Sequence, residues 1–492
     1  MGGFFGVVSR ESCSLDLLYG TDYHSHLGTR RGGITLLDED GYHRDIHNIT
    51  QKGFRAQLEE HAVTFSGQIG IGVISDYEDQ PISSSRFGGI YVVQVGRVNN
   101  LTEIVEEFDR RNVSFSEPAP DKTMIVNPTE AISHLIGLGN TIEDGIEIMQ
   151  NRIDGSSSVL VMTRDSIYAA RDKYGRTPVI IAKKDGAYAV TMETTALFNQ
   201  GFKPYNYEDG VVNGELGPGE IVRISVDGVE RLKKPGDIMQ ICAFLWIYYG
   251  FPASSYEGVN VEVMRNTSGE FLARGDMKRT GKGPGELPFD IITGIPDSGI
   301  GSAIGYVNAS KMREGRPFVK YTPSWPRSFM PQEQRYRDLV ARKKQIPIEQ
   351  LIRGFRILST EDSVVRATQL NGFIRMIIEE YGAREVHMRP ACPPLTQGCK
   401  NLNFSRSSSV NELAARRAIV KINKEDGTNH DVNDFNDENG ELYHRMVGKI
   451  GKDLSLTSLH YQKMDDLIAS IGLPREKLCL GCWRETNCTG CK

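Results

Sequence analysis

The segment 356–369 joins a short apolar stretch to a helical one through a polar loop. Ile357 and Leu358 are typical of the end of a buried strand, and residues 370–381 carry apolar side chains at helical spacing. A loop that enters a helix presents backbone N–H groups that have no partner within the helix, together with the positive end of the helix dipole. Such a loop can bind a phosphate group, so the segment predicts a strand, an anion-binding loop and a helix.

Two adjacent carboxylates, Glu361 and Asp362, stand between the predicted strand and the loop. Carboxylates in that position can hold the hydroxyl groups of an attached sugar, or a Mg²⁺ ion through water. An acidic N-cap on an ordinary strand-to-helix turn explains the same residues without any ligand. The loop alone leaves both interpretations open.

A second segment has the same layout. Residues 291–306 predict a buried strand, a tight loop at 296–299 and a helix. In this loop Ser298 offers a hydroxyl group and Gly299 an unobstructed backbone N–H, which suits an anion. A single Pro-Asp-Ser-Gly turn carries little information. Two such loops in one chain favour a phosphorylated ligand.

The two loops resemble those of one family. Segment 356–369 is similar to the signature that binds phosphoribosyl pyrophosphate (PRPP), and 296–299 to the pyrophosphate loop of the amidophosphoribosyltransferases, which open purine synthesis. Glu361 departs from the family's Asp, and Ala367 and Gln369 replace a Gly and a Thr. The alanine methyl group disfavours close approach of phosphate to the backbone. The resemblance implies Mg²⁺ at Glu361 and Asp362, and a PRPP site made of Pro296, Asp297, Ser298, Gly299, Glu361, Asp362, Ser363, Val364, Val365, Arg366, Ala367 and Thr368.

A basic, irregular segment runs between the two loops, from Lys320 to Lys344. The residues from Arg327 onward resemble the flexible loop with which the family closes over PRPP. The charge pattern alone fits a solvated loop and helix equally well. The position between two anion loops favours a lid that excludes water from the reacting sugar, with Arg327, Arg342 and Lys343 as its charged residues.

The first half of the chain has a different character. Residues 1–232 predict many short strands with glycine-rich turns, and helices at 101–112 and 128–138. Segments 171–178 and 193–197 resemble parts of the family's glutaminase domain. This resemblance implies an N-terminal-nucleophile fold, in which two antiparallel sheets lie between helices as an αββα sandwich.

The catalytic residues that this resemblance implies are replaced. Gly2 stands where relatives have the N-terminal cysteine nucleophile, and the nearest thiol, Cys13, has no terminal amine to serve as base. Leu27 and Val73 replace two arginines, the second of which would pair with the carboxylate of glutamine. Val95 replaces the asparagine of the oxyanion hole. We therefore expect that the chain does not hydrolyse glutamine.

Four of the eight cysteines stand in the last fourteen residues. In a reducing compartment such clustering indicates a metal rather than disulfides. Iron–sulfur members of the family hold a [4Fe-4S] cluster at positions that match Cys242, Cys399, Cys479 and Cys482. The second interpretation is one zinc ion bound by Cys479, Cys482, Cys488 and Cys491. A redox protein that uses the terminal cysteines is the third.

The overall composition excludes several classes. A formal net charge of −5, with 25% charged residues, gives no electrostatic argument for nucleic acid binding. No apolar run reaches the roughly 18 residues of a membrane span. The chain does not start with the basic and then apolar layout of a signal peptide, so a cytoplasmic location is the expectation.

These observations predict an α/β and α+β chain in three parts. Residues 1–232 form a degenerate glutaminase-type domain, 233–475 a type I phosphoribosyltransferase α/β domain, and 476–492 a cysteine-rich metal-binding tail. Residues 422–451, rich in Asn, Asp and Gly, predict a surface insertion. The expected function is transfer of ammonia to PRPP with loss of pyrophosphate, by a homo-oligomer that takes ammonia from solution or from a partner. The alternative is a non-catalytic PRPP- or nucleotide-binding regulator that pairs with an active relative.

Overall fold

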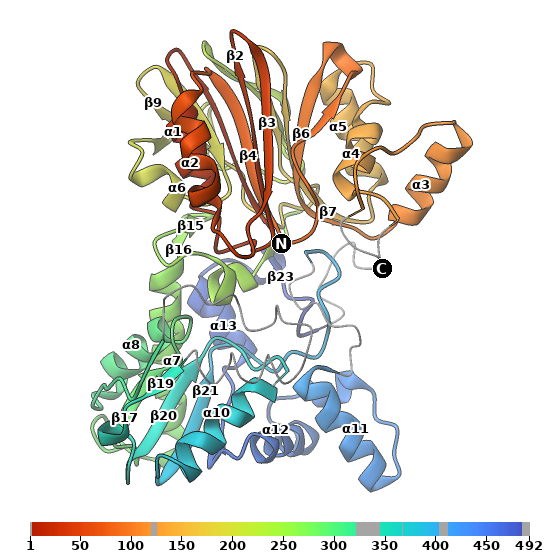
Figure 1. Ribbon diagram of the computed structural model, residues 1–492. Helices are drawn as coiled ribbons and strands as arrows, with labels where there is room; N and C mark the ends of the chain where they lie inside the picture. The colour runs from red at the N-terminus through yellow and green to blue at the C-terminus, as the bar shows by residue number, and fades with distance from the viewer. Residues whose placement is uncertain (1, 120–124, 321–344, 367, 403–411, 485–492) are drawn as a thin grey trace.

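The computed structural model describes residues 2–119, 125–320, 345–366, 368–402 and 412–484 (Figure 1). Two antiparallel sheets occupy the first part of the chain, in the upper half of Figure 1, and a parallel sheet occupies the second part, in the lower half. Among the described residues, no helix combines the length and the apolar character that crossing a lipid bilayer requires.

The first sheet has seven strands in the order β11-β9-β10-β1-β4-β2-β3. Its central strand β1 is buried along its whole length, because Phe5 and Val7 face helices while Phe4 and Val8 face the second sheet. The strands are β1 (Gly3–Ser9), β2 (Arg31–Asp38), β3 (Gly41–Asn48), β4 (Ile69–Ser75), β9 (Ile180–Lys184), β10 (Ala187–Thr191) and β11 (Lys203–Pro204).

The second sheet has six strands in the order β13-β12-β8-β7-β6-β5. Side chains alternate here as well, since Val92 faces helices while Val93 and Val95 face the first sheet. The strands are β5 (Ile82–Ser84), β6 (Ile90–Val98), β7 (Gly155–Met162), β8 (Ile167–Ala170), β12 (Ile221–Ser225) and β13 (Gly228–Lys233).

Helices cover the outer face of each sheet. Leu17 of α1 and Leu58 of α2 pack on the first sheet, and Ile132 of α4 and Ile146 of α5 pack on the second. The predicted αββα sandwich is therefore confirmed, although helices α3 and α4 end two residues earlier than the sequence indicated. The helices are α1 (Ser14–Asp22), α2 (Phe54–Thr64), η1 (Arg86–Gly88), α3 (Leu101–Arg110), α4 (Pro128–Ile136), α5 (Ile142–Arg152) and α6 (Thr195–Phe198).

The parallel sheet has the order β17-β20-β21-β22 and lies between two helical layers. In β20, Ile357 packs with α10, α11 and α12, whereas Leu358 packs with α7 and α8 on the opposite face. This is the predicted α/β unit. Its elements are α7 (Val261–Thr280), β17 (Ile291–Gly294), α8 (Ile300–Ser310), β20 (Arg356–Glu361), α10 (Thr368–Glu379), β21 (Glu385–Pro390), α11 (Ala414–Asp426), α12 (Glu441–Asp453), β22 (Ser458–Leu459) and α13 (Met464–Ile471).

Helices α7 and α8 cross at very short range. A Cβ atom on Gly305 would lie 1.8 Å from the carbonyl oxygen of Asn266, and one on Gly269 would lie 1.9 Å from that of Ser302. Both positions therefore need glycine, which lets α8 pack closely against α7 directly after the loop 296–299.

Short elements connect the two parts. The two-stranded parallel pair β14–β23 joins the chain near residue 241 to its last described segment, and the hairpin β15–β16 lies below the first sheet in Figure 1, between the two halves. These elements are β14 (Ile241–Cys242), η2 (Leu245–Tyr249), β15 (Ser255–Tyr256), β16 (Val259–Asn260), β18 (Phe318–Lys320), β19 (Gln345–Pro347), η3 (Glu349–Leu351), η5 (Val432–Phe435), η6 (Arg475–Lys477) and β23 (Leu478–Cys479).

The prediction of a surface insertion at 422–451 is wrong. This segment contains the end of α11, the turn η5 and most of α12, and it buries Phe435, Met446 and Ile450 in the core beside the parallel sheet. The polar composition of residues 427–440 is that of a connection between two helices, whose apolar residues still recur at helical spacing.

Candidate functional site

Gly2, at the position predicted to lack the nucleophile, is buried directly before β1. Strand β1 pairs with β4 so that Gly3 lies opposite Ile74. A Cβ atom on Gly2 would stand 2.1 Å from the carbonyl oxygen of Ile74, well inside van der Waals contact. The position holds no nucleophile, and a side chain fits there only if the backbone of β4 moves.

The three positions where relatives have arginine or asparagine are part of the core. Leu27, Val73 and Val95 are each at most 2% exposed. They belong to one hydrophobic cluster with Phe4 and Val93, between the two sheets. Cys13 is also buried, and burial raises the pKa of its thiol, which disfavours the reactive thiolate.

A buried polar network, which the sequence did not predict, lies near these positions. The Glu78 carboxylate accepts hydrogen bonds from Gln94 Nε2 (2.6 Å), Gln80 Nε2 (3.1 Å) and Ser75 Oγ (3.2 Å). Burial raises the pKa of Glu78, and its hydrogen bonds oppose that rise. The backbone N–H of Gln94 also donates to Gln80 Oε1 at 2.7 Å, so these polar groups bond to each other. In the sequence, Glu78 stands shortly before Gln80 and Pro81, a pattern typical of a turn, and this pattern does not indicate a buried acid.

His26 is held by a buried carboxylate. His26 Nε2 lies 3.1 Å from Glu193 Oε1, and Tyr256 donates to the same oxygen at 2.7 Å. Ser254 donates to the other oxygen of Glu193. Burial raises the pKa of Glu193, but His26 and the two hydroxyl groups outweigh it and the net shift is downward. This cluster joins the first sheet to the hairpin β15–β16.

The two predicted anion loops meet at the carboxyl edge of the parallel sheet. Strands β17 and β20 are neighbours in register, with Gly294 opposite Thr360, so loop 295–299 and the residues after β20 leave the same edge. Gly299 packs tightly there, because a Cβ atom on it would lie 2.4 Å from the carbonyl oxygen of Thr360. This is the edge at which ligands bind in open α/β sheets.

Glu361 and Asp362 are both nearly buried at that edge, 9% and 6% exposed. Ser298 and Ser363 donate to the two oxygens of Asp362, each at 2.5 Å. Burial and then the charge of Asp362 raise the pKa of Glu361. A cation or hydroxyl donors at this pair would relieve the repulsion between the two carboxylates.

Lys320 is a further charged group at this edge. The sequence predicted it only as the first residue of the basic segment that contains the lid. Its ammonium group forms an ion pair with Asp297 of the first loop. The predicted lid residues Arg327, Arg342 and Lys343 lie outside the described residues. Lys320 stands at the end of β18, so β18 carries a positive charge next to the loop that was assigned to pyrophosphate.

The rest of the second loop is packed against α11. Val364 is 3% exposed and belongs to the core, and the carbonyl oxygen of Val365 accepts from the backbone N–H of Ala414 at 2.8 Å. Arg366 pairs with Glu412 at 3.3 Å. Ala367 and the side chain of Thr368 lie outside the described residues. The contacts with α11 and Glu412 therefore fix the backbone of 363–366, and the side chain of Val364 packs in the hydrophobic core.

The four cysteines predicted to hold a cluster lie in one region. Strand pairing places Cys242 opposite Cys479. Burial and then the charges of Cys479 and Cys399 raise the pKa of Cys242, and a hydrogen bond to Cys399 and then burial raise the pKa of Cys482. Within the described part of the chain, no group of three or more His, Cys, Asp or Glu side chains is arranged to hold a metal ion. Cys488 and Cys491 lie outside the described residues.

Comparisons with known proteins extend over nearly the whole chain. A family model described as glutamine amidotransferase domain matches residues 62–199. The amidophosphoribosyltransferase of Bacillus subtilis is 26% identical over 86% of this chain and 86% of its own length. That of Methanocaldococcus jannaschii is 26% identical over 98% and 96%, and that of Mycobacterium bovis 28% identical over 98% and 85%.

Solved structures agree with the fold. The B. subtilis glutamine PRPP amidotransferase, complexed with ADP and GMP, matches with a TM-score of 0.79 at 23% identity and covers 98% of this chain and 96% of that one. A structure of the allosteric regulatory enzyme of purine biosynthesis matches with a TM-score of 0.78 at 22% identity, over 98% and 95%. These matches confirm the combination of an αββα sandwich with a phosphoribosyltransferase-type sheet.

Proposed function

We propose that this chain, a homologue of the amidophosphoribosyltransferases over nearly its whole length, transfers ammonia to PRPP without hydrolysing glutamine. The observation that carries the proposal is a contrast between the two halves. The positions of the glutaminase site are filled by Leu27, Val73 and Val95, whereas the loops of the PRPP site come together through Ser298 and Asp362.

In this reaction the nitrogen lone pair of ammonia forms a bond to C1 of the ribose. The bond from C1 to the pyrophosphate oxygen breaks, and pyrophosphate leaves with the electron pair. The proton that the new amine loses passes to solvent. The protein contributes mainly position and charge, as is general for transfers of this kind. The backbone N–H of Ser298 would face the leaving pyrophosphate, and Lys320 would add a positive charge beside it. The backbone N–H of Gly299, which the sequence predicted to be unobstructed, instead donates to the carbonyl oxygen of Ile295 at 2.9 Å.

Glu361 and Asp362 would hold the ribose hydroxyl groups and Mg²⁺. Carboxylate oxygens are the ligands that Mg²⁺ prefers, and two of them lie side by side at this edge. When bound, Mg²⁺ neutralises charge on the pyrophosphate. The backbone of 363–366, followed by the first turn of α10, would hold the 5′-phosphate.

We also propose that Cys242, Cys399, Cys479 and Cys482 hold a [4Fe-4S] cluster. The proposal is supported by the type of donor, since thiolates are the ligands of such clusters, and by the pairing of β14 with β23, which sets Cys242 opposite Cys479. The cluster would fasten β14 and β23, near the junction of the two halves, to the loop that carries Cys399.

One observation favours a second candidate, a regulator that binds PRPP without turning it over. Asp297 pairs with Lys320, and Ser298 and Ser363 both bond to Asp362, so the charged groups of the site are engaged with each other. Ala367 and Gln369 in place of the family's residues point the same way.

Pyrophosphate release from PRPP and Mg²⁺ tests the proposal, measured with ammonium chloride and, separately, with glutamine. We expect release that depends on ammonium and not on glutamine. Binding of PRPP without release under either condition would favour the regulator, and release that depends on glutamine would contradict the proposal.

A further inference from the structure

The loop 363–366, proposed above to hold the 5′-phosphate, is anchored from two sides. On one side the Val364 side chain is 3% exposed and belongs to the same core cluster as Phe373 and Ile374 of α10. On the other side the loop meets the start of α11 through two backbone carbonyl groups. The conformation of the loop therefore depends on α11 as well as on the core.

The first of these two contacts comes from the backbone of α11. Leu413, at the N-cap, makes no side-chain hydrogen bond to the N–H groups that begin the helix. The backbone N–H of Ala414 donates instead to the carbonyl oxygen of Val365 at 2.8 Å. A trans peptide is planar, with its C=O and N–H on opposite sides, so the N–H of Arg366 points away from α11.

The second contact comes from Arg417, in the first turn of α11. Its Nη2 donates to the carbonyl oxygen of Arg366, and its Nη1 donates to the carbonyl oxygen of Glu412 at 2.5 Å. The guanidinium group is planar and carries its donors in a fixed fork, so the two bonds fix the two carbonyl groups relative to each other. The Arg366 side chain also pairs with Glu412 at 3.3 Å, but both side chains are exposed, and such surface pairs contribute little. Arg417 is therefore the side chain that holds the loop backbone.

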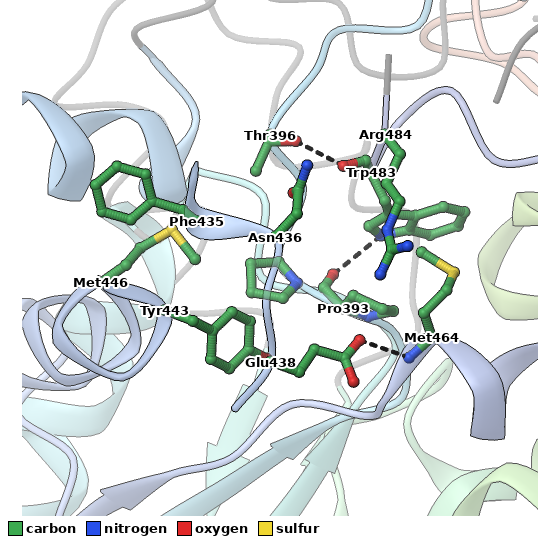
Figure 2. Close-up of a pocket in the computed structure, with 11 residues that line it drawn as sticks. Pro393, Thr396, Phe435, Asn436, Glu438, Tyr443, Met446, Met464, Trp483 and Arg484 are labelled. Carbon is green, nitrogen blue, oxygen red and sulfur yellow. Dashed lines mark hydrogen bonds between the residues drawn. The ribbon is translucent and has the colours of Figure 1, made fainter. Parts of the chain in front are cut away.

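Helix α11 is itself fixed to a neighbouring segment, so it gives the loop a firm support. Arg416 Nε donates to the carbonyl oxygen of Thr396 at 2.6 Å, and its Nη2 donates to Gln397 Oε1 at 2.9 Å. Thr396 Oγ1 in turn donates to the carbonyl oxygen of Trp483 at 2.9 Å (Figure 2). On its inner side α11 buries Ala418 in the core beside the parallel sheet.

We propose that Arg417 is a positioning residue for the 5′-phosphate of PRPP, an inference that rests on the proposed function. Carbonyl oxygens aimed at a phosphate repel it, whereas backbone N–H groups and the first turn of a helix attract it. Arg417 and the N–H of Ala414 draw two carbonyl groups of the loop toward α11, and the loop then presents N–H groups to the phosphate. The phosphate contacts the loop, and Arg417 acts through the loop rather than on the substrate.

Binding of two partial ligands tests the inference. Ribose 5-phosphate reports on the loop 363–366, and pyrophosphate with Mg²⁺ reports on the loop 296–299. Arg417→Met removes the donors and keeps an unbranched side chain. In isothermal titration it should weaken the binding of ribose 5-phosphate at least about tenfold, the effect expected when charged hydrogen bonds are lost. The affinity for pyrophosphate should stay the same, whereas a general loss of structure would weaken both ligands.

Two further variants make the result specific. Arg417→Lys keeps the charge but not the fork, so it should lose part of the affinity for ribose 5-phosphate and none for pyrophosphate. Lys424→Gln removes an exposed charge about two turns further along α11 and should alter neither affinity.

Three results would overturn the inference: unchanged binding of ribose 5-phosphate by Arg417→Met, an equal loss for both ligands, or no binding of ribose 5-phosphate by the unmodified protein. If Arg417→Met does not fold, Arg417→Lys decides by the same comparison. The titrations need no turnover. An unmodified protein that releases no pyrophosphate with ammonium would therefore overturn the proposed reaction and leave this comparison intact.

Discussion

Ser298 donates a hydrogen bond to Asp362 and thereby joins two loops that are far apart in the sequence. The loops follow β17 and β20, neighbouring parallel strands, and Ser363 bonds to the other oxygen of the same carboxylate. Asp362 is therefore the residue at which the proposed pyrophosphate and ribose positions meet.

Asp362→Asn should weaken PRPP binding. The amide keeps the shape of the side chain but removes the charge that holds Mg²⁺ and ribose hydroxyl groups, at a cost of roughly 1–3 kcal/mol in binding free energy. Isothermal titration with PRPP and Mg²⁺ measures the change. Glu379→Gln, an exposed change at the far end of α10, is the matched control and should bind as the unmodified protein does. Equal affinity for Asp362→Asn would remove Asp362 from the site.

Gly2→Cys should not restore glutamine hydrolysis. The new Cβ atom would meet the carbonyl oxygen of Ile74 at 2.1 Å, so β4 must shift, and Leu27, Val73 and Val95 would still lack polar groups. We expect no glutamate release and a lower melting temperature, because overpacking costs about 1–3 kcal/mol. Gly53→Cys is the control, since nothing lies within 4 Å of a Cβ there and stability should hold. Glutamate release by Gly2→Cys would contradict this account of the first half.

Stability should fall as the pH rises through the titration range of Glu215. Burial and then the charge of Glu257 raise the pKa of Glu215 from its ordinary value of 4.5 to about 8. Between these values the folded chain holds a proton that the unfolded chain has lost, so the free energy of unfolding decreases with increasing pH. Glu215→Gln should flatten that slope in urea unfolding between about pH 5 and pH 8. Glu230→Gln, an exposed change on β13, should leave the slope as it is. An unchanged slope in Glu215→Gln would exclude this residue as the cause.

Cysteine variants should separate the two metal models. Anaerobically purified protein should carry about four irons per chain, as one [4Fe-4S] cluster requires. Cys242→Ser should remove the iron and loosen the β14–β23 contact, because serine is a poor ligand for iron. Cys488→Ser and Cys491→Ser should keep the iron. A colourless zinc protein that is insensitive to Cys242→Ser would favour the terminal zinc site instead.

Local patterns were enough to predict the two segments that run from a strand through a loop to a helix, whereas the phosphoribosyltransferase fold was implied by the resemblance of the loops to one family. Ile357 and Leu358, followed by apolar residues at helical spacing, are a local signal for a strand, a loop and a helix. The αββα sandwich was implied by the resemblance of segments 171–178 and 193–197 to the family's glutaminase domain, and the solved structures confirm it.

Features that depend on contacts between distant segments were missed. Glu78 has the local sequence of a turn, and only the packing of β4 and β6 around it makes it a buried acid with three hydrogen bonds. The polar residues 427–440 led to the prediction of a surface insertion at 422–451. Phe435 and Met446 of that segment are core residues, because they pack against distant parts of the chain. Trp483 Nε1 donates to the carbonyl oxygen of Pro393, ninety residues away, and no sequence pattern links the two.

The source of the transferred nitrogen tests the central claim most directly. PRPP and Mg²⁺ are incubated with ¹⁵N-ammonium and unlabelled glutamine together, and the phosphoribosylamine formed is trapped and its nitrogen determined by mass spectrometry. A chain that uses ammonia and has lost its glutaminase should give a product whose nitrogen is all ¹⁵N, at the same rate when glutamine is left out. A product that carries unlabelled nitrogen from glutamine would contradict the account.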